Sequence, residues 1–261
     1  MGNNNHKEKI SENKIKNINE SSNKKFIIIM RHGERNDYEN IKDKIFPKDD
    51  PKLTKKGIEQ ALNIGKKLNE TLFNKLKINE INIFSSPFTR TLMTGIYTCN
   101  SLNKNIIKNL YLIKNLSEYG IDINFKNNKN KSPISFFINE DNNYKKLWNE
   151  YITKPTQNHN YNFYNFNSSF LKIEDVNKIN DNFNNVMKGI LSYSSKTKGN
   201  SINFVVSHHM TLCCLIEECF NIMGIDMSEF FDEFHIGFCS TYVFVLVNEK
   251  LKNNFLNYSL Q

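Results

Sequence analysis

The strongest chemical signal in the sequence is a histidine flanked by arginines directly after an apolar run. Residues 26–30 are all apolar, and Arg31, His32 and Arg35 follow them, with a glycine at position 33. A neutral imidazole nitrogen can attack phosphorus, and arginine presents a planar, permanently charged fork that matches phosphate oxygens. The group therefore indicates a site that binds and attacks a phosphoryl group.

Four segments further along the chain supply matching polar residues in a sensible order. They are residues 53–61 (Leu-Thr-Lys-Lys-Gly-Ile-Glu-Gln-Ala), 85–91 (Ser-Ser-Pro-Phe-Thr-Arg-Thr), 116–118 (Leu-Ser-Glu) and 205–208 (Val-Val-Ser-His). With the first motif, they make the chain resemble the histidine phosphatase superfamily, which also contains the cofactor-dependent phosphoglycerate mutases. The resemblance spans nearly all of residues 25–247.

Within that family, the first motif is most similar to the Sts/TULA-type protein phosphatases. It has the form Arg-His-Gly-Glu-Arg-x-Asp and ends at Asp37. The mutase version of the motif continues Glu-Ser-x-Trp-Asn, and a Glu-Arg-His-Tyr-Gly segment follows later in those enzymes. Neither segment occurs in this sequence. The resemblance therefore favours a phosphatase over a mutase.

The resemblance also implies a role for each matching residue. The catalytic residues would be His32, Glu118 and His208, and the phosphate-binding residues would be Arg31, Arg35, Arg90 and His208. His32 would be the nucleophile and would form a phosphohistidine that water then hydrolyses. Glu118 would be the general acid for the leaving oxygen, an assignment that depends on the resemblance more than on spacing. No metal and no cofactor are implied.

The local sequence places two of these residues at the ends of strands. Residues 81–84 are expected to form a core strand and residues 85–87 a turn that opens a helix, which puts Arg90 in the first helical turn. Residues 202–207 are expected to form another strand that ends at His208. An arginine beside the positive end of a helix dipole is mildly unfavourable, and a bound anion would remove that conflict.

His209 departs from the family pattern, which commonly has glycine or alanine directly after the second histidine. Successive residues at a strand end point in opposite directions, so only one of the pair can face the phosphate, and the motif selects His208. His209 would then line the leaving-group pocket or narrow the site. A metal site on this pair is disfavoured, because adjacent histidines seldom ligate one ion together and no His-x-His or His-Glu-x-x-His spacing accompanies them.

Strand and helix patterns alternate along the chain. Strands are expected at 26–30, 81–84, 106–113, 202–207 and 241–247, and helices at 54–76, 88–102, 173–193 and 210–223. The alternation predicts an α/β fold with a mainly parallel central sheet and helices on both faces, and the resemblance implies that it is phosphoglycerate mutase-like. Residues 121–170 are rich in Asn and aromatic residues, and we expect them to form a cap insertion over the substrate entrance.

Composition divides the chain into a tail and a domain. Residues 1–24 mix Asn, Lys, Ser and Glu and predict a disordered basic tail, while residues 25–261 would form the phosphatase domain, including the insertion at 121–170. The formal net charge is +8, but no groove-reading module or basic strip with interleaved aromatic residues is present, so we expect no nucleic-acid partner. The sequence leaves the oligomeric state open.

Five cysteines without a Cys-x-x-Cys pair or a signal peptide are typical of reduced thiols and a cytoplasmic location. No apolar run approaches the ~18 residues of a membrane span. Gly2 follows Met1 and precedes small polar residues, as in a myristoylation site, although the Ser or Thr expected at the sixth position is missing. An acyl chain at Gly2, with the basic tail, would attach the protein reversibly to a membrane.

Three functions are compatible with these features. The favoured one is a metal-independent phosphomonoesterase that acts on phosphotyrosine protein or on a small phosphate ester. The second is a phosphotransferase of the phosphoglycerate-mutase type. The third is a weakly active interaction module that binds phosphorylated partners, and His209 and the aromatic insertion keep it open.

Overall fold

The computed structural model describes residues 23–36, 50–74, 76–86, 88–102, 107–118, 183–228, 236–247 and 250–258. The strands are β1 (Lys25–Arg31), β2 (Ile78–Ser85), β3 (Ile107–Leu112), β4 (Asn200–Ser207), β5 (Thr241–Val247) and β6 (Lys250–Tyr258). The helices are α2 (Lys55–Leu68), α3 (Thr89–Asn100), α7 (Phe183–Lys196) and α8 (His209–Met223), with a π-helical turn η2 (Asn69–Phe73) and a 3-10 turn η3 (Lys114–Leu116).

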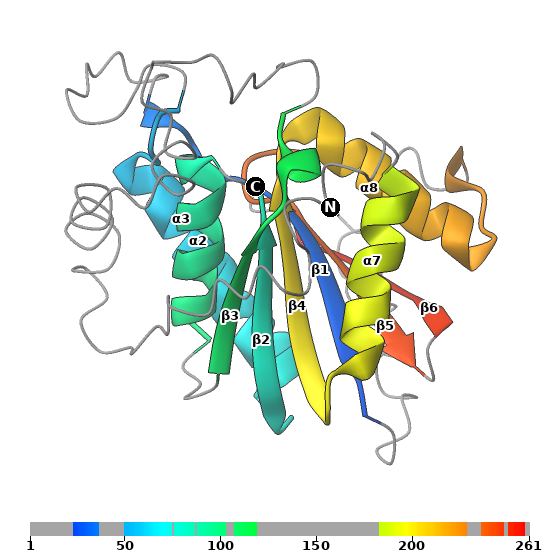
Figure 1. Ribbon diagram of the computed structural model, residues 1–261. Helices are drawn as coiled ribbons and strands as arrows, with labels where there is room; N and C mark the ends of the chain where they lie inside the picture. The colour runs from blue at the N-terminus through cyan, green and yellow to red at the C-terminus, as the bar shows by residue number, and fades with distance from the viewer. Residues whose placement is uncertain are drawn as a thin grey trace, which may run out of the picture.

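The strands form one six-stranded sheet in the order β3-β2-β4-β1-β5-β6. β3, β2, β4 and β1 pair in parallel, whereas β5 is antiparallel to β1 and β6 is antiparallel to β5. The prediction of an α/β fold with a mainly parallel sheet is therefore confirmed. Because the carboxyl ends of parallel strands meet at one edge, the segments that follow β1, β2, β3 and β4 converge there (Figure 1).

Helices cover both faces of the sheet, as predicted, and the alternation of side chains along β1 shows why. Phe26, Ile28 and Met30 pack in one apolar cluster with residues of α2 and α3. Ile27 and Ile29 point to the opposite face and pack in a second cluster with residues of α7 and α8. A strand buried on both sides is apolar throughout, which explains the unbroken run at 26–30.

A row of asparagines fixes the register of the three strands that lead to the site. Asn82 on β2 is paired with Asn109 on β3 and with Asn203 on β4. Its side-chain amide donates to Asn203 Oδ1 at 3.0 Å, and the Asn109 amide donates to Asn82 Oδ1 at 2.9 Å. Buried polar groups need such partners, so a shift by one residue would break the row. The strand ends are thereby held level with one another.

Two element predictions need correction. The helix expected at 54–76 ends as an α-helix at Leu68 and continues only as the π-helical turn to Phe73, although Leu72 and Phe73 are buried and keep the apolar pattern going. Strand β6 was not expected, because residues 250–258 carry Lys and Asn, which are uncommon in strands, and lack clean alternation. It pairs with β5 at the sheet's edge.

Several predictions fall outside the described residues. These are the tail at 1–22 with Gly2, the end of the first motif at Asp37, the start of the helix expected at 173–193, and the insertion at 121–170.

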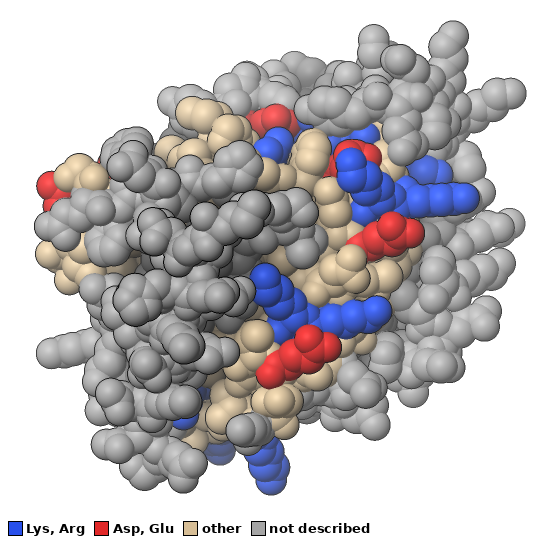
Figure 2. Space-filling model, turned by 180° about the vertical axis from the view of Figure 1, so that it is seen from behind, with Lys and Arg blue, Asp and Glu red and all other residues tan. Residues whose placement is uncertain are grey.

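Within the described ranges, no helix combines the length and apolar character needed to cross a membrane. On the face seen in Figure 2, acidic side chains lie among the basic ones.

Candidate active site

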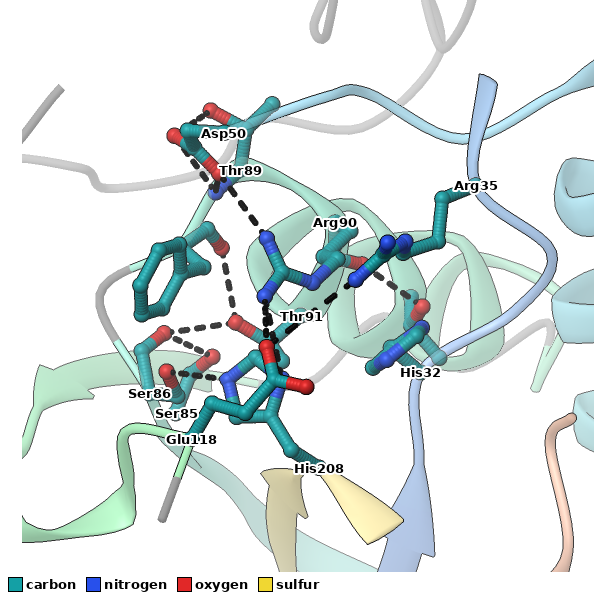
Figure 3. A network of polar contacts seen from close by, with 12 residues as sticks. His32, Arg35, Asp50, Ser85, Ser86, Thr89, Arg90, Thr91, Glu118 and His208 are labelled. Carbon is teal, nitrogen blue, oxygen red and sulfur yellow. Dashed lines mark hydrogen bonds and ion pairs between the residues drawn. The ribbon is translucent and has the colours of Figure 1, made fainter. Parts of the chain in front are cut away.

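Six residues singled out in the sequence lie at or just beyond the carboxyl edge of the parallel sheet. Arg31 ends β1 and His32 follows it, Arg90 lies in the first turn of α3 after β2, Glu118 follows β3, His208 follows β4, and Arg35 lies in the loop after β1. Figure 3 shows Arg35, Arg90, Glu118 and the two histidine rings directed toward one another. Residues far apart in the chain therefore share one polar network.

His32 is held as a nucleophile would have to be. Its ring nitrogen Nδ1 lies 2.8 Å from the carbonyl oxygen of Gly33, and a carbonyl can only accept, so Nδ1 carries the proton and Nε2 keeps its lone pair. The residue is 2% exposed. Burial, followed by the charge of Arg90, lowers the pKa of His32 well below 6.5, so the ring is neutral at physiological pH.

The loop that carries His32 and Arg35 is fastened to the start of α2. Thr54 caps this helix by accepting from the Gly57 amide at 2.9 Å, and its own backbone N–H donates to the Glu34 carbonyl at 3.0 Å. The Glu34 amide donates to the Gln60 side chain at 3.0 Å. A Cβ on Gly57 would clash with the carbonyl oxygen of Glu34, so only glycine permits this approach. The motif at 53–61 therefore positions the first motif.

Arg90 is the most deeply buried charged side chain of the site, at 1% exposure. Its Nη2 donates to Glu118 Oε2 at 2.7 Å, and its Nη1 lies 3.5 Å from Asp50 Oδ1. The guanidinium carbon also lies 4.3 Å from the centroid of the Phe88 ring. Among the described residues, the buried Nε has no hydrogen-bond partner. A donor of this kind is available to an anion that enters the site.

Asp50 is a site residue that the sequence analysis missed. Its carboxylate accepts from the Thr89 amide at 2.8 Å and from the Thr89 hydroxyl at 2.7 Å, and it faces Arg90. Burial raises the pKa of Asp50 to about 6, against the opposing effects of Thr89 and Arg90. Nothing in the sequence links an aspartate near 50 to the start of α3. Its closeness to the motif at 53–61 is the one signal that could have drawn attention to it.

His208 bridges Arg90 and a serine that was also missed as a site residue. Arg90 Nη2 lies 3.3 Å from His208 Nδ1, and arginine can only donate, so Nδ1 accepts. Nε2 therefore carries the proton and donates to Ser86 Oγ at 2.9 Å. Burial, followed by the charge of Arg90, lowers the pKa of His208 well below 6.5. Its ring centroid lies 5.3 Å from that of His32.

Glu118 is the acidic group that faces Arg90, Arg35 and His208. Besides its bond to Arg90, Oε2 lies 3.9 Å from Arg35 Nη1 and 3.8 Å from His208 Nδ1. Its side chain is 32% exposed, and that of Arg35 is 23% exposed. Both groups therefore lie where the buried network meets the surface.

Arg31 makes its contacts with the segment that precedes β5. Its Nη1 donates to the Ile236 carbonyl at 2.9 Å, and its guanidinium carbon lies 4.5 Å from the centroid of the Phe238 ring. Phe238 also packs against His32, with ring centroids 5.8 Å apart. Arg31 thus ties the turn before β5 to the site, and its charge contributes to lowering the pKa of His32.

The structure separates the two adjacent histidines. His208 is 0% exposed, whereas His209 begins α8 and is exposed. No hydrogen bond or ion pair joins His209 to the other site residues within the described ranges. Burial and the charge of Arg31 lower its pKa. Among the residues that the structure describes, no group of His, Cys, Asp and Glu side chains could hold a metal ion.

The histidine environments predict a dependence of stability on pH. Because His32 stays neutral when folded, the unfolded chain takes up a proton below its pKa of ~6.5 that the folded chain does not, so stability falls as pH falls. We expect wild type to lose about 1.4 kcal/mol more unfolding free energy than His32→Gln between pH 7.5 and 5.5. Urea denaturation at the two pH values measures this, and equal losses in both proteins would contradict it.

One family model matches part of the chain. Residues 27–121 match the model of the histidine phosphatase superfamily (branch 1). No curated protein gives a significant match to the chain. The matched range includes most of β1, all of α2, β2 and α3, and Glu118, while His208 lies beyond it.

Solved structures with a similar course of the chain include phosphatases and a mutase. Phosphoserine phosphatase from Entamoeba histolytica, in complex with 3-phosphoglyceric acid, is 19% identical with a TM-score of 0.42, covering 91% of this chain and 98% of that one. Ecdysone phosphate phosphatase from Bombix mori, in complex with tungstate, is 14% identical with a TM-score of 0.48, covering 90% of this chain and 92% of that one. Phosphoglycerate mutase from Plasmodium falciparum is 16% identical with a TM-score of 0.44, covering 91% of each chain. Over residues 27–121 the chain is therefore similar to the histidine phosphatase superfamily.

Proposed function

We propose that the protein is a metal-independent phosphomonoesterase that acts through a phosphohistidine on His32. Its substrate would be a phosphotyrosine protein or a small phosphate ester. The observation that carries this proposal is the hydrogen bond from His32 Nδ1 to the Gly33 carbonyl. It leaves Nε2 unprotonated in a buried site beside arginines, where a phosphoryl group would be held.

The arginines supply the charge that a phosphate dianion needs. Arg90 offers a buried Nε without a partner among the described residues, and the partly exposed Arg35 lies near the same carboxylate oxygen of Glu118 that Arg90 contacts. Guanidinium groups keep their charge when buried and bind oxygens in fixed directions. The dianion would also counteract the arginines at His208 and favour its protonated form, which could then donate to a phosphate oxygen.

The reaction would proceed in two displacements at phosphorus. His32 Nε2 attacks the phosphorus in line, the bond to the leaving oxygen breaks, and the protonated Glu118 carboxyl gives its proton to that oxygen. Water then attacks the phosphohistidine while the Glu118 carboxylate takes its proton. The nitrogen–phosphorus bond breaks, and phosphate and neutral His32 are released. The position of Glu118 at the edge of the buried network suits a group that must meet both an ester oxygen and water.

Hydrolysis of para-nitrophenyl phosphate with excess chelator tests the function. We expect turnover that resists the chelator and is inhibited competitively by inorganic phosphate, because the charge in the site comes from arginines. Circular dichroism confirms that the protein is folded. A folded protein that binds phosphate but gives no turnover would contradict the proposal and favour a phospho-ligand-binding module. Turnover that the chelator removes would exclude the metal-independent mechanism.

A further inference from the structure

Two hydroxyl groups on either side of His208 hold the chain just before Glu118. Ser207 Oγ donates to the Leu116 carbonyl at 2.7 Å, and Thr211 Oγ1 donates to the Ser117 carbonyl at 2.7 Å. Ser207 is the last residue of β4, and Thr211 lies in the first turn of α8. The two carbonyls that they hold are the last two before Glu118 in the sequence.

Thr211 is the closer of the two to the carboxyl group, because the Ser117 carbonyl belongs to the peptide bond that leads into Glu118. Thr211 is 0% exposed, so water cannot replace its hydroxyl at that carbonyl without a rearrangement. Glu118 follows the short turn η3, and its side chain is one-third exposed. A general acid must lie within hydrogen-bond distance of the leaving oxygen. Because the Glu118 side chain is partly exposed, its placement depends on the fixed position of the backbone that carries it.

The same segment is fixed from two directions by groups that belong to the site. Arg90 holds the Glu118 carboxylate at 2.7 Å, and Thr211 holds the preceding peptide from the helix that begins directly after His208. Arg90 is needed to bind phosphate, so substrate will compete for its hydrogen bonds. The hydroxyl of Thr211 faces a backbone carbonyl and does not have to give up its partner.

We propose that Thr211 is a positioning residue for the general acid, and this inference rests on the proposed function. Its hydroxyl sets the place of the Ser117–Glu118 peptide and so the reach of the Glu118 carboxyl toward the leaving oxygen. Losing the hydroxyl impairs proton donation while leaving His32 and the arginines in place. Esters whose leaving group needs a proton therefore suffer more than esters whose leaving group departs as a stable anion.

The test compares kcat/KM of Thr211→Val on a series of esters from para-nitrophenyl phosphate to phenyl phosphate and an alkyl phosphate. Valine keeps the shape of threonine and removes the donor. We expect a loss of about 10- to 100-fold on the alkyl ester and of no more than about threefold on para-nitrophenyl phosphate. Thr211→Ser retains the hydroxyl and is expected to restore the wild-type dependence on the leaving group.

Thr98→Val is the matched control. Thr98 is also 0% exposed, and its hydroxyl also donates to a backbone carbonyl, that of Ala61 on α2 at 3.2 Å. The Thr98→Val substitution removes the same kind of hydrogen bond, here from the interface between α2 and α3. A loss in Thr98→Val that depends on the leaving group as in Thr211→Val would overturn the proposal, because the effect would then come from general destabilisation.

Glu118→Gln separates failure of this inference from failure of the proposed function. If Glu118→Gln shows the leaving-group dependence and Thr211→Val loses the same factor on every ester, or nothing, the inference about Thr211 is wrong and the acid assignment stands. If Glu118→Gln itself shows no such dependence, the assignment of the acid is wrong, and the inference fails with it. Competitive inhibition by inorganic phosphate, unchanged in Thr211→Val, confirms that the variant keeps a folded phosphate site.

Discussion

His32→Ala loses essentially all turnover, with kcat/KM on para-nitrophenyl phosphate expected to fall by at least about 10⁴-fold. The reason is that Nε2 would form the bond to phosphorus, and no other nitrogen in the described network is free in the same way. His208 uses Nε2 to donate to Ser86 and Nδ1 to accept from Arg90. Steady-state kinetics with active-site titration measures the loss.

His32→Asn is the matched variant for this test. An asparagine amide can donate to the Gly33 carbonyl as Nδ1 does, but it has no atom at the position of Nε2. The variant therefore keeps the internal bond of the loop and lacks the nucleophile. We expect it to be as inactive as His32→Ala while inorganic phosphate still inhibits binding of a labelled phosphate ligand. Activity in His32→Asn above about 1% of wild type would mean that the nucleophile is another group.

Arg90→Lys is expected to lower kcat/KM by about 10²- to 10³-fold, although the formal charge is retained. The guanidinium contacts Glu118 with one nitrogen and faces Asp50 with another, and its buried Nε is available to an oxygen of the substrate. A lysine ammonium is a single point of charge and cannot serve these three directions. The loss should appear in kcat/KM and in the inhibition constant of inorganic phosphate.

Arg35→Lys provides the comparison for Arg90. Its side chain is 23% exposed, and its Nη1 lies 3.9 Å from Glu118 Oε2. Solvent screening and this longer distance reduce the contribution of the guanidinium shape. We expect a loss of about tenfold. An Arg90→Lys enzyme that stays within tenfold of wild type, or that is more active than Arg35→Lys, would contradict the assignment of Arg90 as the central phosphate-binding residue.

The sequence predicted the grouping of the motif residues for a physical reason. Three parts of the site each follow an apolar run of strand length: Arg31 with His32, the segment before Arg90, and His208. Parallel strands bring their carboxyl ends to one edge of the sheet. The burial of β1 on both faces was predicted from its lack of alternation and is confirmed. For Glu118 the family resemblance was needed, because an isolated glutamate after a strand carries no local signal.

The contacts that complete the site could not be derived in this way. Asp50 meets Thr89 across 39 residues, and Ser86 meets His208 across 122. These separations depend on which strands become neighbours, and β4 lies between β2 and β1 although it follows both in sequence. Strand order in a sheet is a global property of packing, so local periodicity does not reveal these partners.

The most direct test of the central claim is rapid-quench trapping of the phosphoenzyme during hydrolysis of para-nitrophenyl phosphate. The nitrophenolate leaves readily, so phosphorylation is fast and the intermediate accumulates before water attacks. We expect an acid-labile, alkali-stable phosphoryl group on the peptide that contains His32, formed and lost at rates that match turnover. Label on any other residue, or continued turnover without label on His32, would contradict the phosphohistidine mechanism.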